Sequence, residues 1–154
     1  MQDGGSEEKL VINKSDKIIK GVWHTTGFVD PEQAVRDTSC ALPPVLSIVD
    51  VETGGATEVE LKGAKAVFFV REFEGQSERR DLRFHQHAPT HDGVWVRLEF
   101  QDGEELEGLV YNSIAPLVEE GFFLLPTDPG SNNRLVYVMK SALKNYCVLG
   151  VRTL

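Results

Sequence analysis

Several features that would disclose this protein's chemistry are scarce or missing from its sequence. Its 154 residues contain two cysteines, Cys40 and Cys147, which lie far apart. The first residues are polar and acidic and do not form a secretion signal, so we expect both thiols to be reduced in a cytoplasmic protein. No apolar run approaches the roughly 20 residues that a membrane-spanning helix needs, which predicts that the chain does not contact a membrane.

Motifs of the common enzyme classes are missing as well. We find no glycine-rich phosphate-binding loop, no dinucleotide-binding fingerprint and no Ser-His-Asp order. Neither cysteine has a histidine nearby in a nucleophile motif, and Cys147 lies in an apolar segment that is typical of a buried strand. We therefore expect a protein that is not an enzyme and that has no cofactor.

Basic residues are also scarce relative to acidic ones. The chain has 16 Lys and Arg residues against 24 Asp and Glu residues, so its net charge is −8. Because contacts with phosphate groups need clustered basic residues, this balance argues against nucleic acid as a partner. It also argues against adhesion to an anionic membrane surface.

What the sequence does contain is alternation. From residue 94 to residue 100, apolar side chains alternate with Trp95, Arg97 and Glu99, which is the period of two of a half-buried strand. Asp102-Gly103 then supplies a short hairpin turn, and we expect residues 106–110 to form the returning strand.

Similar patterns predict ten strands and almost no helix. In the first half we expect strands at residues 9–13, 18–23, 45–51, 58–61 and 66–73. In the second half we expect them at residues 94–100, 106–110, 122–126, 135–139 and 145–151. Asp30 followed by Pro31 predicts one short helix at residues 31–36, and residues 140–143 predict a single turn.

The order of these elements indicates an internal repeat. Gly21 and Gly108 both follow a charged residue within a predicted strand, where glycine usually marks a bulge or a bend. Aligning the two glycines shifts the sequence by 87 positions, whereas Val59 and Val138 align at a shift of 79. The first half therefore has 8 additional residues, which we assign to the connection at residues 30–44.

The repeat predicts how the chain is divided. We expect a disordered tail at residues 1–8 and a first β-barrel repeat at residues 9–75. A polar linker at residues 76–93 then leads to a second β-barrel repeat at residues 94–154.

This order of strands, with an Asp-Gly turn and a glycine in the next strand, resembles the Sm-like (Hfq-like) barrel, which is similar to SH3-type barrels. The resemblance is carried by residues 96–108 and 122–148, and more weakly by residues 10–21 and 45–70. It implies an all-β fold of two tandem five-stranded Sm-like/SH3-like barrels with one short helix in the first half. An eight-stranded sandwich is the competing fold.

The chain is also similar to a bacterial family of unknown function that is built from such modules, some of them fused to signalling receivers. This similarity implies a non-catalytic adaptor in bacterial signalling or regulation. We expect such a module to be a monomer or homodimer and to bind a protein partner through an exposed sheet edge.

Three arginines are a candidate nucleotide site. Arg79 and Arg83, with Arg80 between them, match the RxxxR element of the cyclic-dinucleotide-binding PilZ domain. The resemblance implies phosphate contacts and stacking on guanine. The second PilZ element, Asp/Asn-x-Ser-x-x-Gly, has its nearest match at residues 37–39, which lie upstream and lack the final glycine. The alternative functions are therefore nucleotide or RNA binding by these arginines, or a solvated strand that binds no ligand.

Three histidines and a carboxylate are a candidate metal site. His85 and His87 are two residues apart, so on a strand both would point to the same side, as bidentate metal capture requires. His91 or Asp92 would complete the site after a turn. The segment is also polar enough to be a surface loop without metal, and both interpretations stand.

Two further groups have simpler interpretations. An acidic run along the 94–110 hairpin is expected to be a solvated edge that discourages aggregation, and it comprises Glu99, Asp102, Glu104, Glu105 and Glu107. The adjacent aromatic pairs Phe68-Phe69 and Phe122-Phe123 place one ring on each face of their strands. We expect these rings to lie in the core, to meet between the two halves, or to mark a partner-binding patch.

Overall fold

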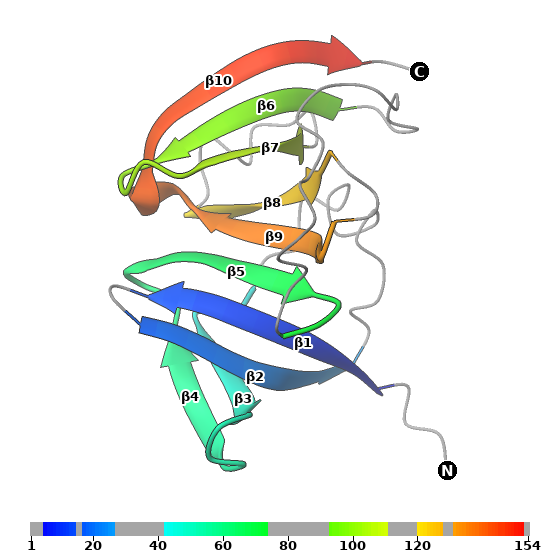
Figure 1. Ribbon diagram of the computed structural model, residues 1–154, viewed down its shortest axis with the longest axis vertical. Coiled ribbons are helices and arrows are strands. Elements are labelled where there is room, and N and C mark those ends of the chain that lie inside the picture. The colour runs from blue at the N-terminus through cyan, green and yellow to red at the C-terminus, as the bar shows by residue number, and fades with distance from the viewer. Residues whose placement is uncertain are drawn as a thin grey trace.

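Ten antiparallel β-strands form one open sheet in the order β10-β6-β7-β8-β9-β5-β1-β2-β3-β4 (Figure 1). The computed structural model describes residues 5–14, 17–26, 42–73, 93–110, 120–127 and 131–152. The strands of the first half are β1 (Gly5–Lys14), β2 (Lys17–Thr26), β3 (Val45–Asp50), β4 (Ala56–Glu60) and β5 (Ala64–Val70). Those of the second half are β6 (Gly93–Phe100), β7 (Glu105–Val110), β8 (Gly121–Pro126), β9 (Asn133–Met139) and β10 (Leu143–Arg152).

The prediction of an all-β chain is confirmed, and each of the ten predicted strands overlaps an observed one. The single turn predicted at residues 140–143 is the short 3₁₀ helix η1 (Lys140–Ala142). The helix predicted at residues 31–36 lies outside the described residues. The strand β1 begins at Gly5, so it takes in half of the tail that was predicted to be disordered.

The prediction of two closed five-stranded barrels is wrong. Closing the second half on itself would require β9 to pair with β10, but β9 pairs with β5 of the first half, from Ala66↔Val138 to Phe69↔Leu135. β4 and β10 are left as the two ends of the sheet. The chain is therefore one continuous sheet, and the pair β5–β9 is the joint between its halves.

Both faces of the joint are buried. Consecutive side chains of a strand point to opposite faces, so β5 and β9 each contribute residues to two cores. One face carries the first core, which contains Leu10, Ile12, Leu46, Ile48, Val59, Val67, Phe69, Phe123, Leu135, Tyr137 and Met139. The other face carries the second core, which contains Ala66, Phe68, Val70, Val96, Leu98, Phe100, Val110, Phe122, Leu124, Val136 and Val138. The first half thus curls over one face of the joint and the second half over the other.

The two phenylalanine pairs show how the halves share these cores. Phe69 and Phe123 meet in the first core, with ring centroids 6.4 Å apart, although they come from different halves. Phe68 and Phe122 lie together in the second core. The expectation that these rings meet between the halves is confirmed, and each half supplies part of the core of the other.

Gly21 and Gly108 occupy the same place in their halves. Each pairs with the first strand of its half and with the third, at the few residues where the second and third strands touch. A Cβ on Gly108 would lie 2.3 Å from Leu124 Cδ2, and one on Gly21 would lie 2.5 Å from Ile48 Cδ1. Glycine is needed at both positions because the third strand approaches the backbone so closely.

The strand registers of the two halves also correspond. Val59 pairs with Leu46 of β3 as Val138 pairs with Phe122 of β8, and the two valines are 79 positions apart. The same shift of 79 relates β5 to β10. Val67 and Tyr146 are paired in the same way with the first strand of their half, and so are Phe69 and Val148.

The additional length of the first half is not the single insertion that the sequence suggested. Leu46 follows Gly21 by 25 residues, whereas Phe122 follows Gly108 by 14, so the connection between the second and third strands is 11 residues longer in the first half. The step from the third strand to Val59 is 13 residues, and the step to Val138 is 16. A long connection and a short turn together give the net difference of 8.

Polar contacts hold the joint at one end through Lys65. Its Nζ lies 2.8 Å from Asp102 Oδ2 and also bonds Glu104, and both acids belong to the β6–β7 turn of the other half. The ammonium also lies 4.8 Å from the ring centroid of Phe100. Burial lowers the pKa of Lys65, but the hydrogen bonds and charges of the two acids raise it more, so the net pKa lies above its ordinary 10.5.

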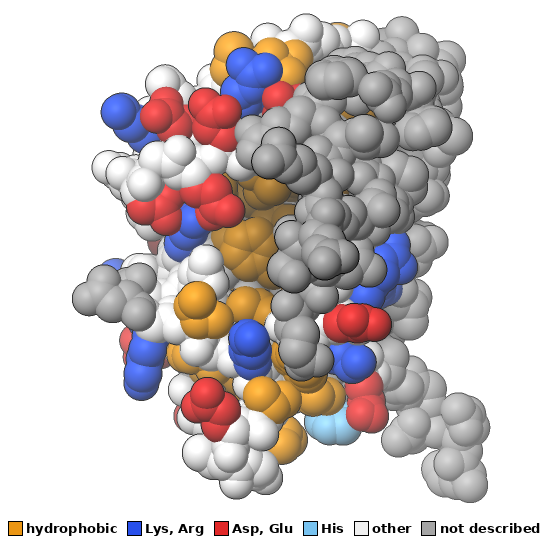
Figure 2. All heavy atoms as spheres, in the orientation of Figure 1, with side chains coloured by type: hydrophobic (Ala, Val, Ile, Leu, Met, Phe, Trp, Pro, Cys, Tyr) orange, Lys and Arg blue, Asp and Glu red, His pale blue; other side chains and the backbone are white. Residues whose placement is uncertain are grey.

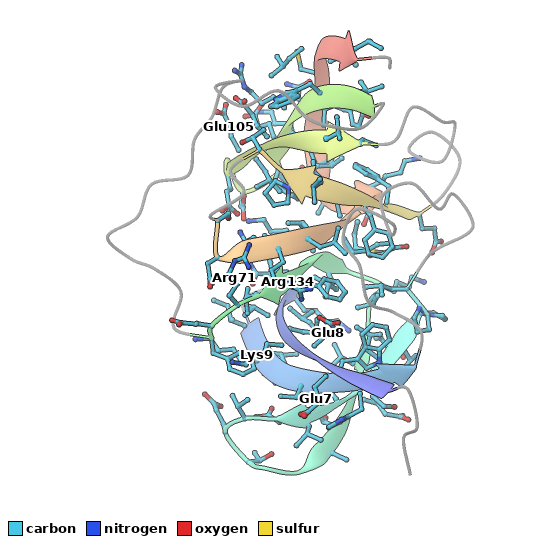
Figure 3. All side chains as sticks on the ribbon, turned by 90° about the vertical axis from the view of Figure 1, so that its right-hand side faces the viewer. Glu7, Glu8, Lys9, Arg71, Glu105 and Arg134 are labelled. Carbon is cyan, nitrogen blue, oxygen red and sulfur yellow. The ribbon has the colours of Figure 1, made fainter. Side chains whose placement is uncertain are left out.

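At its other end the joint is held by a second set of contacts. The Arg71 backbone N–H donates to the Asn132 carbonyl oxygen at 2.9 Å, and the Arg71 Nε–H donates to the Ser131 carbonyl oxygen at 3.0 Å. Arg134 Nη1 lies 2.7 Å from Glu8 Oε1, an ion pair that spans β5 and in which the Glu8 side chain is 5% exposed. Figure 3 shows Arg71 and Arg134 side by side above Glu8.

The variant Gly108→Ala tests the close approach of β7 and β8. It should lower the free energy of unfolding by about 2–3 kcal/mol, because the new Cβ would also lie 2.5 Å from the Leu125 backbone oxygen. Gly150→Ala is the matched control, since among the described residues, apart from its chain neighbours, no heavy atom lies within 4 Å of the Cβ position there. Its effect should stay within about 0.5 kcal/mol. Urea denaturation with equal midpoints for the two variants would contradict the close approach.

The variant Lys65→Met tests the ion pairs across the joint. At neutral pH it should unfold at lower urea concentration than the wild type, because it removes both bonds to the β6–β7 turn. Lys62→Met, which changes an exposed lysine in the β4–β5 turn, is the control and should leave the midpoint unchanged.

The same comparison has a defined pH dependence. The hydrogen bond from Lys65 holds the pKa of Asp102 below its ordinary 3.8, so this carboxyl contributes stability above that value and loses it as the pH falls through the lower folded pKa. Lys65, whose pKa is raised, contributes stability below 10.5 and loses it as the pH rises through its folded pKa. The gap between the wild type and Lys65→Met should therefore narrow in acid. A gap of constant size between neutral pH and about pH 3 would show that the pair does not act.

Candidate functional site: the open edge at β10

The strand β10 is one end of the sheet, and its sequence favours an extended strand through Tyr146, Val148 and Val151. It follows directly after η1, which turns the chain back from β9. It pairs along its length with β6. Among the described residues no strand faces its other side, so β10 is an edge strand of the sheet.

An apolar row lies along this edge. Tyr146, Val148 and Val151 pair with residues of β6 that line or border the second core, so they lie on the core face of the sheet. They are nevertheless 39%, 53% and 63% exposed. Figure 2 shows hydrophobic side chains gathered at this end of the molecule, where Figure 1 places β10. These three residues are the β10 patch.

The corresponding residues of the first half show what the β10 patch lacks. Val67 and Phe69 take the positions of Tyr146 and Val148, and both are fully buried. They are buried because β9 continues the sheet beyond β5 and contributes Leu135 to the same core, with Phe123 from the adjacent β8. In the part of the chain that is described, no strand continues the sheet beyond β10.

The opposite end of the sheet, at β4, is polar. Four apolar residues of β8 and β9 cover the first core. At the equivalent positions of the first half, in β3 and β4, the residues are exposed. The covering residues Phe123, Leu135, Tyr137 and Met139 correspond to Ser47, Ala56, Glu58 and Glu60. Charged residues on an edge strand discourage pairing with another strand. The two ends therefore differ in chemistry, and β10 is the end suited to an apolar partner.

Two neighbours fix the start of β10. Glu99 of β6 accepts a hydrogen bond from Asn145 Nδ2 at 3.2 Å and lies 4.0 Å from Lys144 Nζ. The ring of Tyr146 meets Phe122 edge to face, with centroids 5.9 Å apart. Burial raises the pKa of the Tyr146 hydroxyl above its ordinary 10.0, so at neutral pH this group is uncharged and can still donate a hydrogen bond.

Cys147 corrects one sequence expectation. It lies in a strand, as predicted, but it is exposed rather than part of the core. Its cross-strand neighbour is Arg97, also exposed, on the face of β10 that points away from the second core. Alternation in the sequence identified the strand, but it did not show that the sheet ends there. The other cysteine, Cys40, lies outside the described residues.

The predicted ligand sites lie outside the described residues. This applies to the nucleotide candidates Arg79, Arg80 and Arg83, and to the metal candidates His85, His87, His91 and Asp92. Within the described ranges, no group of three or more His, Cys, Asp or Glu residues is placed to hold a metal ion.

The acidic run of the 94–110 hairpin is only partly the solvated edge that was predicted. Asp102 and Glu104 are exposed but bond Lys65 across the joint. Glu107 is buried, with its side chain 4% exposed, and its Oε2 lies 3.0 Å from both Nε and Nη2 of Arg97. The run therefore stabilises the fold in addition to shielding the surface.

Sequence reasoning missed the β10 patch. It assigned residues 145–151 to a closing strand, where apolar side chains need no further cover. Two signals were available in the sequence. Four of these seven residues are Tyr, Val or Leu. In addition, β9, the strand expected to close the barrel with them, has apolar side chains on both of its faces. Such a strand needs cover on both faces, which one closed barrel cannot supply.

Among the described residues, no helix is both long and apolar enough to cross a bilayer. Comparison with known proteins finds no similar curated protein and no similar solved structure. Residues 6–150, which include all the strands except the ends of β1 and β10, match one family of unknown function. The chain therefore belongs to the DUF6982 family.

Proposed function

We propose that this chain is a non-catalytic adaptor module that binds a protein partner by pairing an extended segment of it with β10. The observation that carries the proposal is the β10 patch, a row of exposed apolar side chains along a strand edge that no described strand pairs. Strand addition uses both features at once. The backbone hydrogen bonds give affinity, and the alternating side chains give specificity.

The polar β4 end supports the choice of β10. Neither β4 nor β10 pairs with a second strand in the described part of the chain, so backbone pairing alone does not select one of them. Glu58 and Glu60 make β4 unsuited to an apolar strand, while Val148 and Val151 make β10 suited to one. A contiguous apolar patch at the surface of a soluble protein is typical of an interaction site.

The setting of this module is part of the proposal. A role in bacterial signalling or regulation rests on the sequence resemblance, and a cytoplasmic location rests on the acidic composition and the expected reduced thiols. We also infer that the two halves are copies of one five-stranded unit. Their equal strand order and the common shift of 79 positions in the fourth and fifth strands support this origin.

A displayed library of random peptides, selected on the full-length chain, tests the proposal. Selected peptides should slow amide hydrogen exchange across residues 143–152, because strand addition protects the outer backbone groups of β10. Val148→Lys should weaken their binding by about tenfold or more, since a charge on an edge strand opposes pairing.

Ile18→Lys is the matched control. Ile18 is 64% exposed and apolar, but it lies on β2, far from β10 in the sheet order, so the same change there should leave binding intact. Both variants should keep the thermal midpoint of the wild type because both side chains are exposed. Peptides that bind both variants equally, or that protect segments other than β10, would refute the proposal.

A further inference from the structure

The geometry points to a partner segment with the chemistry of β9. Like β9, it would carry large apolar side chains at alternate positions, directed at the β10 patch, and it would add a carboxylate beside Lys144, the contact that the β6–β7 turn makes with Lys65. This inference rests on the proposed function, because it assigns the occupant of the same edge. It comes from the joint, where the chain itself shows how the equivalent strand, β5, is covered.

The apolar part of the partner follows from the register of the joint. In β9, Leu135 pairs with Phe69 and Tyr137 pairs with Val67. Both side chains are buried in the first core, where the Tyr137 ring packs edge to face on Phe123 at 4.8 Å. The positions of Phe69 and Val67 are those of Val148 and Tyr146 in β10. A strand continuing the sheet beyond β10 would therefore place its own alternate side chains over these two residues.

The carboxylate follows from the lysines. Lys65 and Lys144 are 79 positions apart, and each lies one residue before the paired core of its strand. At the joint, Lys65 bonds two acids, both from the β6–β7 turn of the other half and neither from β9, and its side chain is 14% exposed. The side chain of Lys144 is 63% exposed and lies 4.0 Å from one acid, Glu99. A partner that covers β10 as the whole second half covers β5 would also supply an acid to Lys144, as the β6–β7 turn does to Lys65.

The same register excludes β4 of a second copy as the occupant. Head-to-tail addition would place Glu58 where Tyr137 lies at the joint, over Tyr146, and would place Ala56 over Val148. Burying the Glu58 carboxylate over an apolar patch without a cation is unfavourable. The partner is therefore a different segment, apolar at the positions where β4 is polar.

The probe that tests this inference is a labelled peptide with the sequence of residues 131–140 and the change Met139→Glu. Extending the register of the joint by one pair places residue 139 opposite Lys65, and hence opposite Lys144 when the peptide lies on β10. The peptide should bind the full-length chain and slow amide exchange at residues 143–152. Replacing both Leu135 and Tyr137 of the peptide by Ser should weaken binding by about tenfold or more.

The predicted contact between Lys144 and the carboxylate of the partner is tested with variants of the protein. Lys144→Glu should weaken binding of the peptide by roughly three- to fivefold at low salt, and the difference should fade as salt is added. Lys140→Glu is a control of equal charge change in η1, outside β10, and should leave the affinity unchanged. An affinity that is equal in Lys144→Glu and the wild type would overturn the assignment of the carboxylate.

Three outcomes overturn the inference in distinguishable ways. If the peptide displaces β9 from β5, exchange at residues 64–70 would change and Val148→Lys would have no effect. If library peptides protect β10 but lack alternating apolar residues and an acid, this inference fails while the proposed function stands. If β10 becomes protected with rising protein concentration as the mass doubles in sedimentation, the occupant is a second copy.

Discussion

The pairing of β5 with β9 is the interaction on which the rest of the structure depends. It joins the halves into one sheet and requires each of the two strands to be apolar on both faces. Each half then completes the core of the other, because Phe123 enters the first core and Phe68 enters the second. The polar contacts of Lys65 and Arg71 secure the two ends of this pair. Neither half could retain its core if the joint opened, since each would expose the residues that its neighbour now covers.

This pairing also determines why the sheet is open. A strand edge can accept one neighbour, so β9 cannot close the second half onto β10 while it is paired with β5. The same choice leaves β4 and β10, among the described strands, at the two ends of the sheet. An open sheet exposes backbone groups at both ends, and proteins usually protect such ends with charge. Here Glu58 and Glu60 protect β4, whereas β10 has an apolar row in its central part.

The sequence was sufficient to predict where the strands lie, but not to predict whether they close into barrels. Alternation is a local property, so segments such as 94–100 and 135–139 could be identified as strands without knowing their partners. The positions of Gly21 and Gly108 could be matched because a close backbone approach leaves a glycine in the sequence. Closure depends on which distant strand β9 pairs with, and no local pattern specifies that. The exposure of Cys147 was misjudged for the same reason, since it depends on where the sheet ends.

The exposed residues of β10 are not explained by the needs of the fold alone. Single exposed apolar residues such as Ile18 are common on protein surfaces and need no function. Tyr146, Val148 and Val151 differ because they form one row on one face, in register with β6 residues that border the second core. A chain that required β10 merely as an edge strand would tolerate polar residues there, as it does at Ser47 and Glu58 of the other end. The apolar row at the edge where the sheet can be extended is therefore the feature on which the proposed strand addition rests.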